Sequence, residues 1–108
     1  MPRPTIHPGE ILMEELAELG VTPTELSRQI NVPPNRVTQI IHGRRSVTGD
    51  TALRLGHWFG TSAQFWLNLQ SAYDIRVAEE RAGREIAELP TRPTDPAVSP
   101  RKQQPTPL

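Results

Sequence analysis

The sequence contains no cysteine, and no apolar run in it approaches the roughly 20 residues that a membrane-spanning helix needs. The lack of cysteine excludes disulfide bonds and thiolate metal sites. The N-terminal stretch Met1-Pro2-Arg3-Pro4 also lacks the apolar segment of a signal peptide. We therefore expect a cytoplasmic protein with no membrane partner.

Hydrophobic residues are also scarce, at 35% of the chain. This share lies below the usual one for a globular domain, so part of the chain is expected to build no core. The sequence divides at Leu89, after which proline recurs among polar residues, at Pro90, Pro93, Pro96, Pro100, Pro105 and Pro107. Such a segment buries too little apolar surface to offset its ordering entropy. We predict a folded domain over residues 1–89 and a disordered, Pro-rich C-terminal tail over residues 90–108.

The net charge is zero, which at first sight argues against a nucleic-acid partner. Its distribution does not, because the segment 22–60 holds five arginines against Glu25 and Asp50, a local formal charge of +3. The segment before it is acidic, with Glu10, Glu14, Glu15 and Glu18 opposed only by Arg3. A binding surface acts through its local field, so the asymmetry matters more than the sum.

The spacing of apolar residues, interrupted by capping residues and glycines, predicts an all-α fold of five helices. Thr22-Pro23-Thr24-Glu25 has the residues of a capping box with proline at the first helical position. The inward stripe of the first helix is expected to be Leu12, Leu16 and Leu19. The expected helices begin at Pro8, at Pro23 and at Pro34 (ending at His42), then cover Gly49–Phe59 and run from the Thr61-Ser62-Ala63-Gln64 cap toward Leu89.

The second and third helices, joined by Asn31-Val32-Pro33, suggest a helix-turn-helix, whose second helix enters the DNA major groove. At about 100° per residue, Val37, Ile40 and Ile41 share one side of Pro34–His42 and would anchor it. The polar side chains lie opposite or on the flanks, and we expect them to read bases: Asn35, Arg36, Thr38, Gln39 and His42. Asn and Gln can pair with adenine in a bidentate way, and Arg with guanine.

Two cations and one hydroxyl are expected to contact phosphates. Arg44 and Arg45 follow the helix stop at Gly43, where the chain would leave the groove and cross the sugar-phosphate backbone. Thr24 lies at the start of the second helix, where backbone amides favour anions. Such contacts fix position without reading sequence.

Several blocks in order closely resemble the HigA family of antitoxins, within the phage-repressor-like (XRE or Cro/C1-type) regulators. These blocks are His7-Pro8-Gly9-Glu10-Ile11-Leu12, Gly43-Arg44-Arg45-Ser46-Val47-Thr48, Asp50-Thr51-Ala52-Leu53-Arg54-Leu55, Gly60-Thr61-Ser62 and Phe65-Trp66-Leu67-Asn68-Leu69-Gln70. The resemblance covers roughly His7 to Val77. It departs from the family pattern at Pro33-Pro34, which stiffens the start of the recognition helix, and in the tail beyond Leu89.

The resemblance implies a five-helix domain, a homodimer and binding to a palindromic operator. It also implies neutralisation of a HigB-type toxin, a small RNase that cleaves messenger RNA on the ribosome. By similarity, the DNA-contacting segment includes Asn35, Arg36, Thr38, Gln39, Arg44 and Arg45.

The last helix carries apolar residues that one protomer does not obviously bury. Trp58, Phe65 and Trp66 are best explained as core, but Leu67, Ile75 and Val77 point away from the main stripe, and an exposed apolar patch favours oligomerisation. We hypothesise a two-fold dimer built around residues 63–77. Its candidate interface residues are Phe65, Trp66, Leu67, Leu69 and Tyr73.

Other functions are less well supported by the residues. His7, His42 and His57 have no paired-ligand spacing, so we expect no metal site and no cofactor. Glu14, Glu15 and Glu18 are better explained as a hydrated or partner surface than as catalysts, so we expect no enzyme. Two alternatives to the antitoxin remain: a solitary regulator of the same class without a cognate toxin, and a helical module that binds only proteins.

The expected mechanism is occlusion of a promoter by a dimer with two copies of the recognition helix in successive major grooves. Toxin binding would modulate this repression. Because HigB-type toxins tend to be basic, the acidic first helix and the tail are the candidate toxin surfaces.

Overall fold

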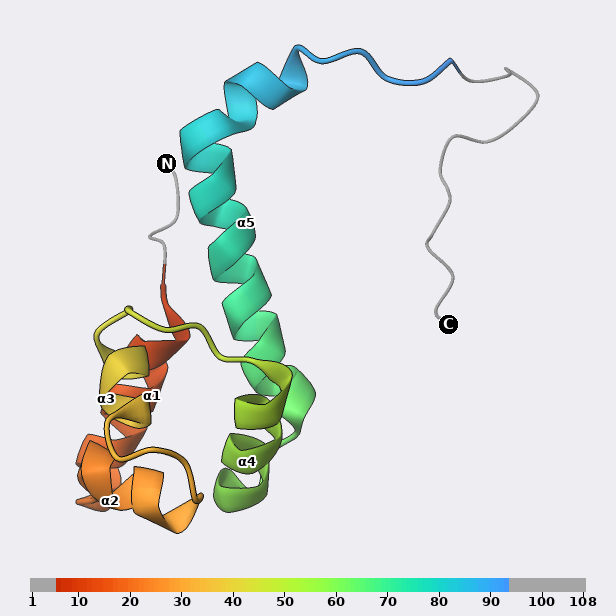
Figure 1. Cartoon of the computed structure of the whole chain (residues 1–108). Coiled ribbons are helices and arrows are strands. Elements are labelled where there is room, and N and C mark those ends of the chain that lie inside the picture. Colours follow the sequence, from red (N-terminus) through yellow and green to blue (C-terminus); the bar gives the residue numbers. More distant parts are fainter. Residues whose placement is uncertain (1–5, 94–108) are drawn as a thin grey trace.

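A computed structural model describes residues 6–93 of the chain, which form five α-helices and no strand (Figure 1). The helices are α1 (Pro8–Leu19), α2 (Pro23–Gln29), α3 (Arg36–Ile41), α4 (Gly49–Phe59) and α5 (Ala63–Ala87). The predicted all-α, five-helix fold is confirmed. The predicted tail falls largely on residues 94–108, outside the described residues, so its disorder stays a prediction.

Hydroxyl side chains start three of the helices. The side chains of Thr22, Thr48 and Ser62 each accept a hydrogen bond from the backbone N–H three residues ahead. Such a bond satisfies one of the backbone donors that a helix leaves unpaired at its start. The glycines Gly20 and Gly60 end α1 and α4 in the left-handed conformation, with φ of 71° and 77°.

The recognition helix is shorter than the sequence indicates. It was expected over Pro34–His42, but Pro34 and Asn35 form a turn and α3 begins at Arg36, whose N–H donates to the carbonyl of Pro33 at 2.9 Å. Asn35 lies outside the α-helical region, with φ of −98° and ψ of 5°, so regular helical geometry begins only at Arg36. Asn35 is consequently the N-cap and His42 the C-cap of the helix.

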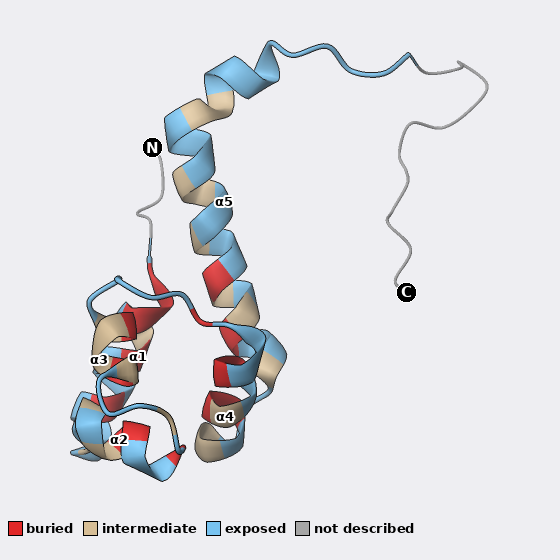
Figure 2. Ribbon diagram, viewed as in Figure 1, coloured by how far each residue is buried: buried red, intermediate tan, exposed pale blue. Residues whose placement is uncertain are grey.

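The core lies between all five helices and is lined by Leu12, Leu16, Leu26, Ile30, Val37, Ile40, Val47, Ala52, Leu55 and Trp66. Figure 2 shows these buried positions on the mutually facing sides of the helices. One predicted inward residue is instead exposed: Leu19, the last residue of α1, is 56% exposed.

Helix α5 is divided between a packed and a projecting half. Its first turns pack against α4 and bury Trp66 and Gln70, whereas the remainder extends beyond the domain and is exposed or half-buried (Figures 1 and 2). Gly83 does not interrupt the helix. Within residues 6–93, the projecting half therefore buries little of its surface against other helices.

Candidate nucleic-acid interface

The angle between α2 and α3 is held by Ser27, a buried serine on α2. Its hydroxyl oxygen accepts a hydrogen bond from the N–H of Val37, 3.2 Å away, and its carbonyl accepts one from Val32 N–H at 3.0 Å. Asn31 turns the chain between the helices with φ of 59°, a conformation that asparagine tolerates better than most residues. The recognition helix is thus attached to α2 through a hydrogen bond inside the core.

Helix α3 has the two sides that groove reading requires. Val37 and Ile40 are fully buried and Ile41 is half-buried, as the wheel predicts. On the other side, Asn35 and His42 are exposed, while Thr38 and Gln39 are half-buried. The carboxamide of Asn35 does not cap the helix, so it is not committed to the backbone.

Arg36 differs from the other expected reading residues. Its side chain is half-buried, and its Nε is a buried atom without a hydrogen-bond partner among the described residues. The guanidinium contributes, after that of Arg54, to lowering the pKa of Asp50 at the start of α4. Arg36 therefore lies within electrostatic reach of the start of α4.

Arg45, one of the predicted phosphate contacts, lies against α3 because of the turn that follows the helix. Gly43 adopts φ of 74°, and the N–H groups of Gly43 and Arg44 donate to the carbonyls of Ile40 at 3.0 Å and Gln39 at 2.8 Å. The exposed Arg45 then donates from Nε to Oε1 of Gln39 at 2.9 Å. Arg44 is exposed as well.

The same loop is attached to α5 at its other end. The N–H of Val47 donates to Oε1 of Gln70, which is buried, at 2.8 Å. The amide of Gln70 in turn donates to Oδ1 of Asp74 at 2.9 Å. The loop that carries both arginines is therefore fixed between α3 and α5.

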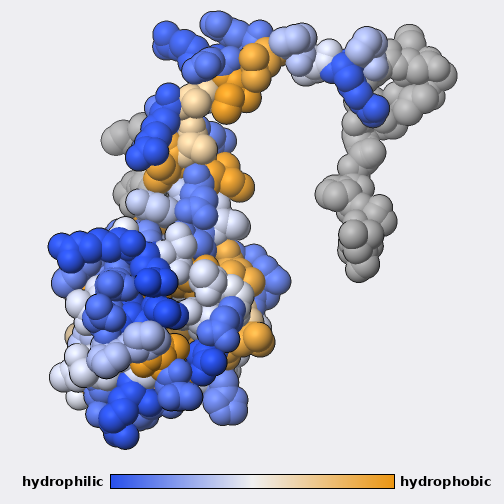
Figure 3. All heavy atoms as spheres, in the orientation of Figure 1, coloured by the Kyte–Doolittle hydropathy of each residue, from blue (hydrophilic) through white to orange (hydrophobic). Residues whose placement is uncertain are grey.

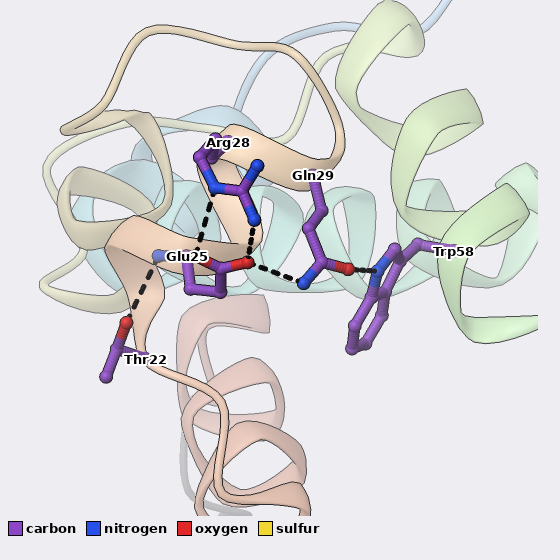
Figure 4. A network of polar contacts seen from close by, with 5 residues as sticks. All are labelled: Thr22, Glu25, Arg28, Gln29 and Trp58. Carbon is purple, nitrogen blue, oxygen red and sulfur yellow. Dashed lines mark hydrogen bonds and ion pairs between the residues drawn. The ribbon is translucent and has the colours of Figure 1, made fainter.

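Thr24 is exposed in the first turn of α2, as a phosphate contact requires. The neighbouring Thr22 caps the helix, but Glu25 does not complete the predicted capping box (Figure 4). Its carboxylate accepts hydrogen bonds from Arg28 and Gln29, and the bond from Arg28 is the main cause that lowers the pKa of Glu25. The N-cap N–H and Arg28 are each three residues from Glu25, but Arg28 is a charged donor and forms the stronger hydrogen bonds.

This network continues to α4, because Oε1 of Gln29 accepts from the indole N–H of Trp58 at 2.7 Å (Figure 4). Beside it, Arg54 pairs with Asp50 and donates from Nη1 to the carbonyl of Ile30 at 2.9 Å. The end of α2 is thus held against α4 by two polar contacts, which fixes the helix-turn-helix on the rest of the domain.

The expected dimer residues are distributed between core and surface. Trp66 is 1% exposed, so its side chain fills the protomer's own core and offers no area to a second copy. Phe65 is 42% exposed, and Leu67, Leu69 and Tyr73 are half-buried. Of the expected interface residues, these four offer surface to a second copy, and Ile75 and Ile86 on the same helix are exposed as well.

The three histidines occupy separate elements: His7 caps α1, His42 ends α3 and His57 lies on α4. Within residues 6–93, no group of three or more His, Cys, Asp or Glu residues is placed to hold a metal ion. In the same range, none of the helices combines the length and apolar character that crossing a membrane requires.

Three residues that organise this surface have no signal in the sequence. Ser27, Arg54 and Gln70 each contact a segment 10 or more residues away. Serine, arginine and glutamine are ordinary on solvated helix faces, so only the fold reveals that these three connect elements.

The chain matches known proteins over most of its length. A helix-turn-helix family model matches residues 12–66. Virulence-associated protein I of Dichelobacter nodosus is 49% identical over 78 residues, which span 71% of this chain and 72% of that protein.

Solved structures agree with the sequence matches. A HigA-family addiction module antidote protein from Coxiella burnetii is 49% identical, with a TM-score of 0.81 over 83% of this chain and 99% of that one. The antitoxin HigA of Pseudomonas aeruginosa, solved with the higBA promoter, is 40% identical, with a TM-score of 0.77 over 88% and 100% of the two chains. The chain therefore belongs to the helix-turn-helix family, among the HigA-type antitoxins.

Proposed function

We propose that this protein is an antitoxin that binds its own operator as a homodimer, with α3 in the major groove, and neutralises a HigB-type toxin. The observation that carries the proposal is the match to a HigA solved with its promoter, which the chain covers in full. The family consists of DNA-binding regulators rather than enzymes.

The exposed side of α3 supports direct readout of bases. Asn35, Gln39 and His42 lie within one sector of about 60° by the 100° wheel, on the side of the helix opposite the buried Val37 and Ile40. A helix anchored from behind in this way presents polar side chains to base edges without disturbing the core.

Phosphate contacts complete the proposed interface on both sides of α3. Thr24 at the start of α2 and Arg44 after α3 are exposed, and each would contact one backbone of the duplex. The zero net charge does not oppose this arrangement, because the arginines gather in segment 22–60 while the acidic residues of α1 lie outside it.

The dimer is proposed on α5, around residues 63–77. Phe65 and Ile75 expose 42% and 59% of their surface there. The space-filling view shows hydrophobic surface along the projecting part of this helix (Figure 3). A two-fold dimer would place two copies of α3 about one DNA turn apart, roughly 10 base pairs.

The toxin surface is proposed on α1, where Glu14, Glu15 and Glu18 are all exposed. Their shared negative charge would steer a basic toxin toward the antitoxin. The surface lies on a helix whose opposite side packs on α3, so toxin binding there is in a position to influence the recognition helix.

Two experiments test the proposal. Gel shifts with the DNA upstream of its own gene are expected to give a sequence-specific complex whose affinity falls with salt. Co-expression with the adjacent reading frame is expected to relieve growth arrest caused by that frame alone. Specific DNA binding without such rescue would identify a solitary regulator, and rescue without DNA binding a protein-binding module; either result contradicts the proposal as stated.

A further inference from the structure

The side chain of Gln39, the central candidate for reading bases, is held by Arg45 at the end of α3. Nε of Arg45 donates to Oε1 of Gln39 at 2.9 Å. A guanidinium has only donors, so the amide atom that meets it must be the carbonyl oxygen, however the two ends of the amide are assigned. One of the two lone pairs of Oε1 is therefore engaged by a charged donor, and the other N–H groups of Arg45 lie beside the amide.

Backbone hydrogen bonds fix the chain on both sides of Arg45. The backbone of the same residue, Gln39, accepts from Arg44 N–H at 2.8 Å in the turn centred on Gly43. Two residues after Arg45, the N–H of Val47 is bound by the buried Gln70. The backbone of Arg45 thus lies between two fixed points, which keeps its guanidinium within reach of Gln39.

The engaged oxygen changes which base the amide fits. Bidentate pairing with adenine needs an acceptor for the N6 amino group and a donor for N7. Guanine presents two acceptors, N7 and O6, in the same positions. With Oε1 engaged by the guanidinium, the amino group of Gln39 and the remaining N–H groups of Arg45 form a surface on which donors predominate. Such a surface matches the two acceptors of guanine, and its positive charge opposes the amino group of adenine.

On the basis of the operator binding proposed above, we propose that Gln39 and Arg45 form a single reading unit that selects guanine. Gln39 alone would favour adenine, and Arg45 alone would contact phosphate. The pairing also satisfies Oε1 next to guanine, where it would otherwise face two acceptors without a donor. In the groove, where water is displaced, a hydrogen bond from a charged donor is stronger than on the free surface.

The test measures dissociation constants at fixed salt for operators in which each base pair is changed singly. The position read by the unit is the one at which Gln39→Ala loses its discrimination. Wild type is expected to prefer guanine over adenine there by about tenfold or more. Arg45→Met frees Oε1 and is expected to lower this ratio by about tenfold, in favour of adenine.

The matched control is Arg44→Met, which removes an equal charge from the same exposed turn. It is expected to weaken all operators by a similar factor and leave the guanine-to-adenine ratio unchanged. All three side chains are exposed or half-buried, so circular dichroism is expected to show native helix content in every variant.

Three results would overturn the inference: an adenine preference in wild type, a guanine preference that survives Arg45→Met, or no position at which Gln39→Ala changes discrimination. Wild-type protein that shows no sequence-specific binding would contradict the proposed function itself. Failure of the inference and failure of the proposed function are distinguishable, because the inference is tested only when the wild-type protein binds DNA sequence-specifically.

Discussion

His7 is an unusual N-cap, because that position is more often serine, threonine, aspartate or asparagine. Its ring atom Nδ1 accepts a hydrogen bond from the N–H of Gly9 at 2.9 Å. The backbone N–H of His7 donates to the carboxylate of Glu10, so the capping box is complete. The ring contacts Tyr73 of α5 edge-on, with centroids 4.7 Å apart. One imidazole therefore starts α1 and attaches it to the last helix.

This cap makes stability depend on pH. Burial lowers the pKa of His7 below its ordinary value, against the smaller opposing effects of Asp74 and Glu10. The folded state therefore resists a proton that the unfolded chain takes up near pH 6.5, and protonated Nδ1 cannot accept from Gly9. We expect the free energy of unfolding to be constant above about pH 6.5 and to fall below it. Urea denaturation at pH 7.5 and 5.5 measures this.

The matched variants are His7→Asn and His57→Asn. Asparagine is a good N-cap that does not titrate, so His7→Asn is expected to remove the pH dependence in this window. His57 is exposed on α4, and its replacement is expected to preserve that dependence. If the free energy of unfolding of His7→Asn still falls below pH 6.5 as in wild type, another group is responsible for the pH dependence.

At the scale of elements, α1 and α3 approach each other more closely than side chains allow. A Cβ on Gly9 would lie 2.1 Å from the carbonyl oxygen of Ile40, a backbone atom that cannot move aside. The recognition helix consequently rests directly on the backbone of the first turn of α1. A residue remote from the reading side of α3 thus sets its position.

Gly9→Ala is therefore expected to destabilise the protein by about 1–3 kcal/mol, as overpacking does. Gly83→Ala is the matched control, since the nearest atom to its new Cβ is 3.7 Å away on Glu79. It is expected to stabilise by about 0.5–1 kcal/mol, because alanine is the better helix former. Urea midpoints compare the two, and a Gly9→Ala protein as stable as wild type would be incompatible with this packing.

At the scale of the whole molecule, the projecting half of α5 distinguishes a monomer from a dimer. Ile75 is 59% exposed on that helix, and Leu19 is 56% exposed at the end of α1. The two residues offer similar apolar area in different places. Substituting each of them therefore distinguishes a specific interface on α5 from a general effect of exposed apolar residues.

Ile75→Glu is expected to convert a micromolar dimer into a monomer, since a charge would be buried in the proposed interface. Operator affinity is expected to fall with it, because two half-sites are no longer bound together. Leu19→Glu is expected to leave the mass unchanged. Light scattering measures the mass, and a monomeric wild type at micromolar concentration would exclude this dimer.

The sequence by itself determined what depends on near neighbours along the chain. The caps Thr22, Thr48 and Ser62 and the glycine stops Gly20 and Gly60 act within one helical turn, so they are sufficient to predict three helix starts and two helix ends. The buried side of α3 is likewise predicted by the helical spacing of its apolar residues. The shortened start of α3 was missed because Asn35 departs from helical geometry within an otherwise helical pattern.

The tertiary structure alone decided how those helices are held and what the reading side chains present. Only folding brings together the segments that form three contacts: Val37 with Ser27, Val47 with Gln70, and Gly9 with Ile40. The bond from Arg45 to Gln39 likewise depends on the turn at Gly43, and it places a charged donor on the carbonyl oxygen of the amide. Local hydrogen bonding sets the elements, whereas packing across the core sets their angles and the chemistry they expose.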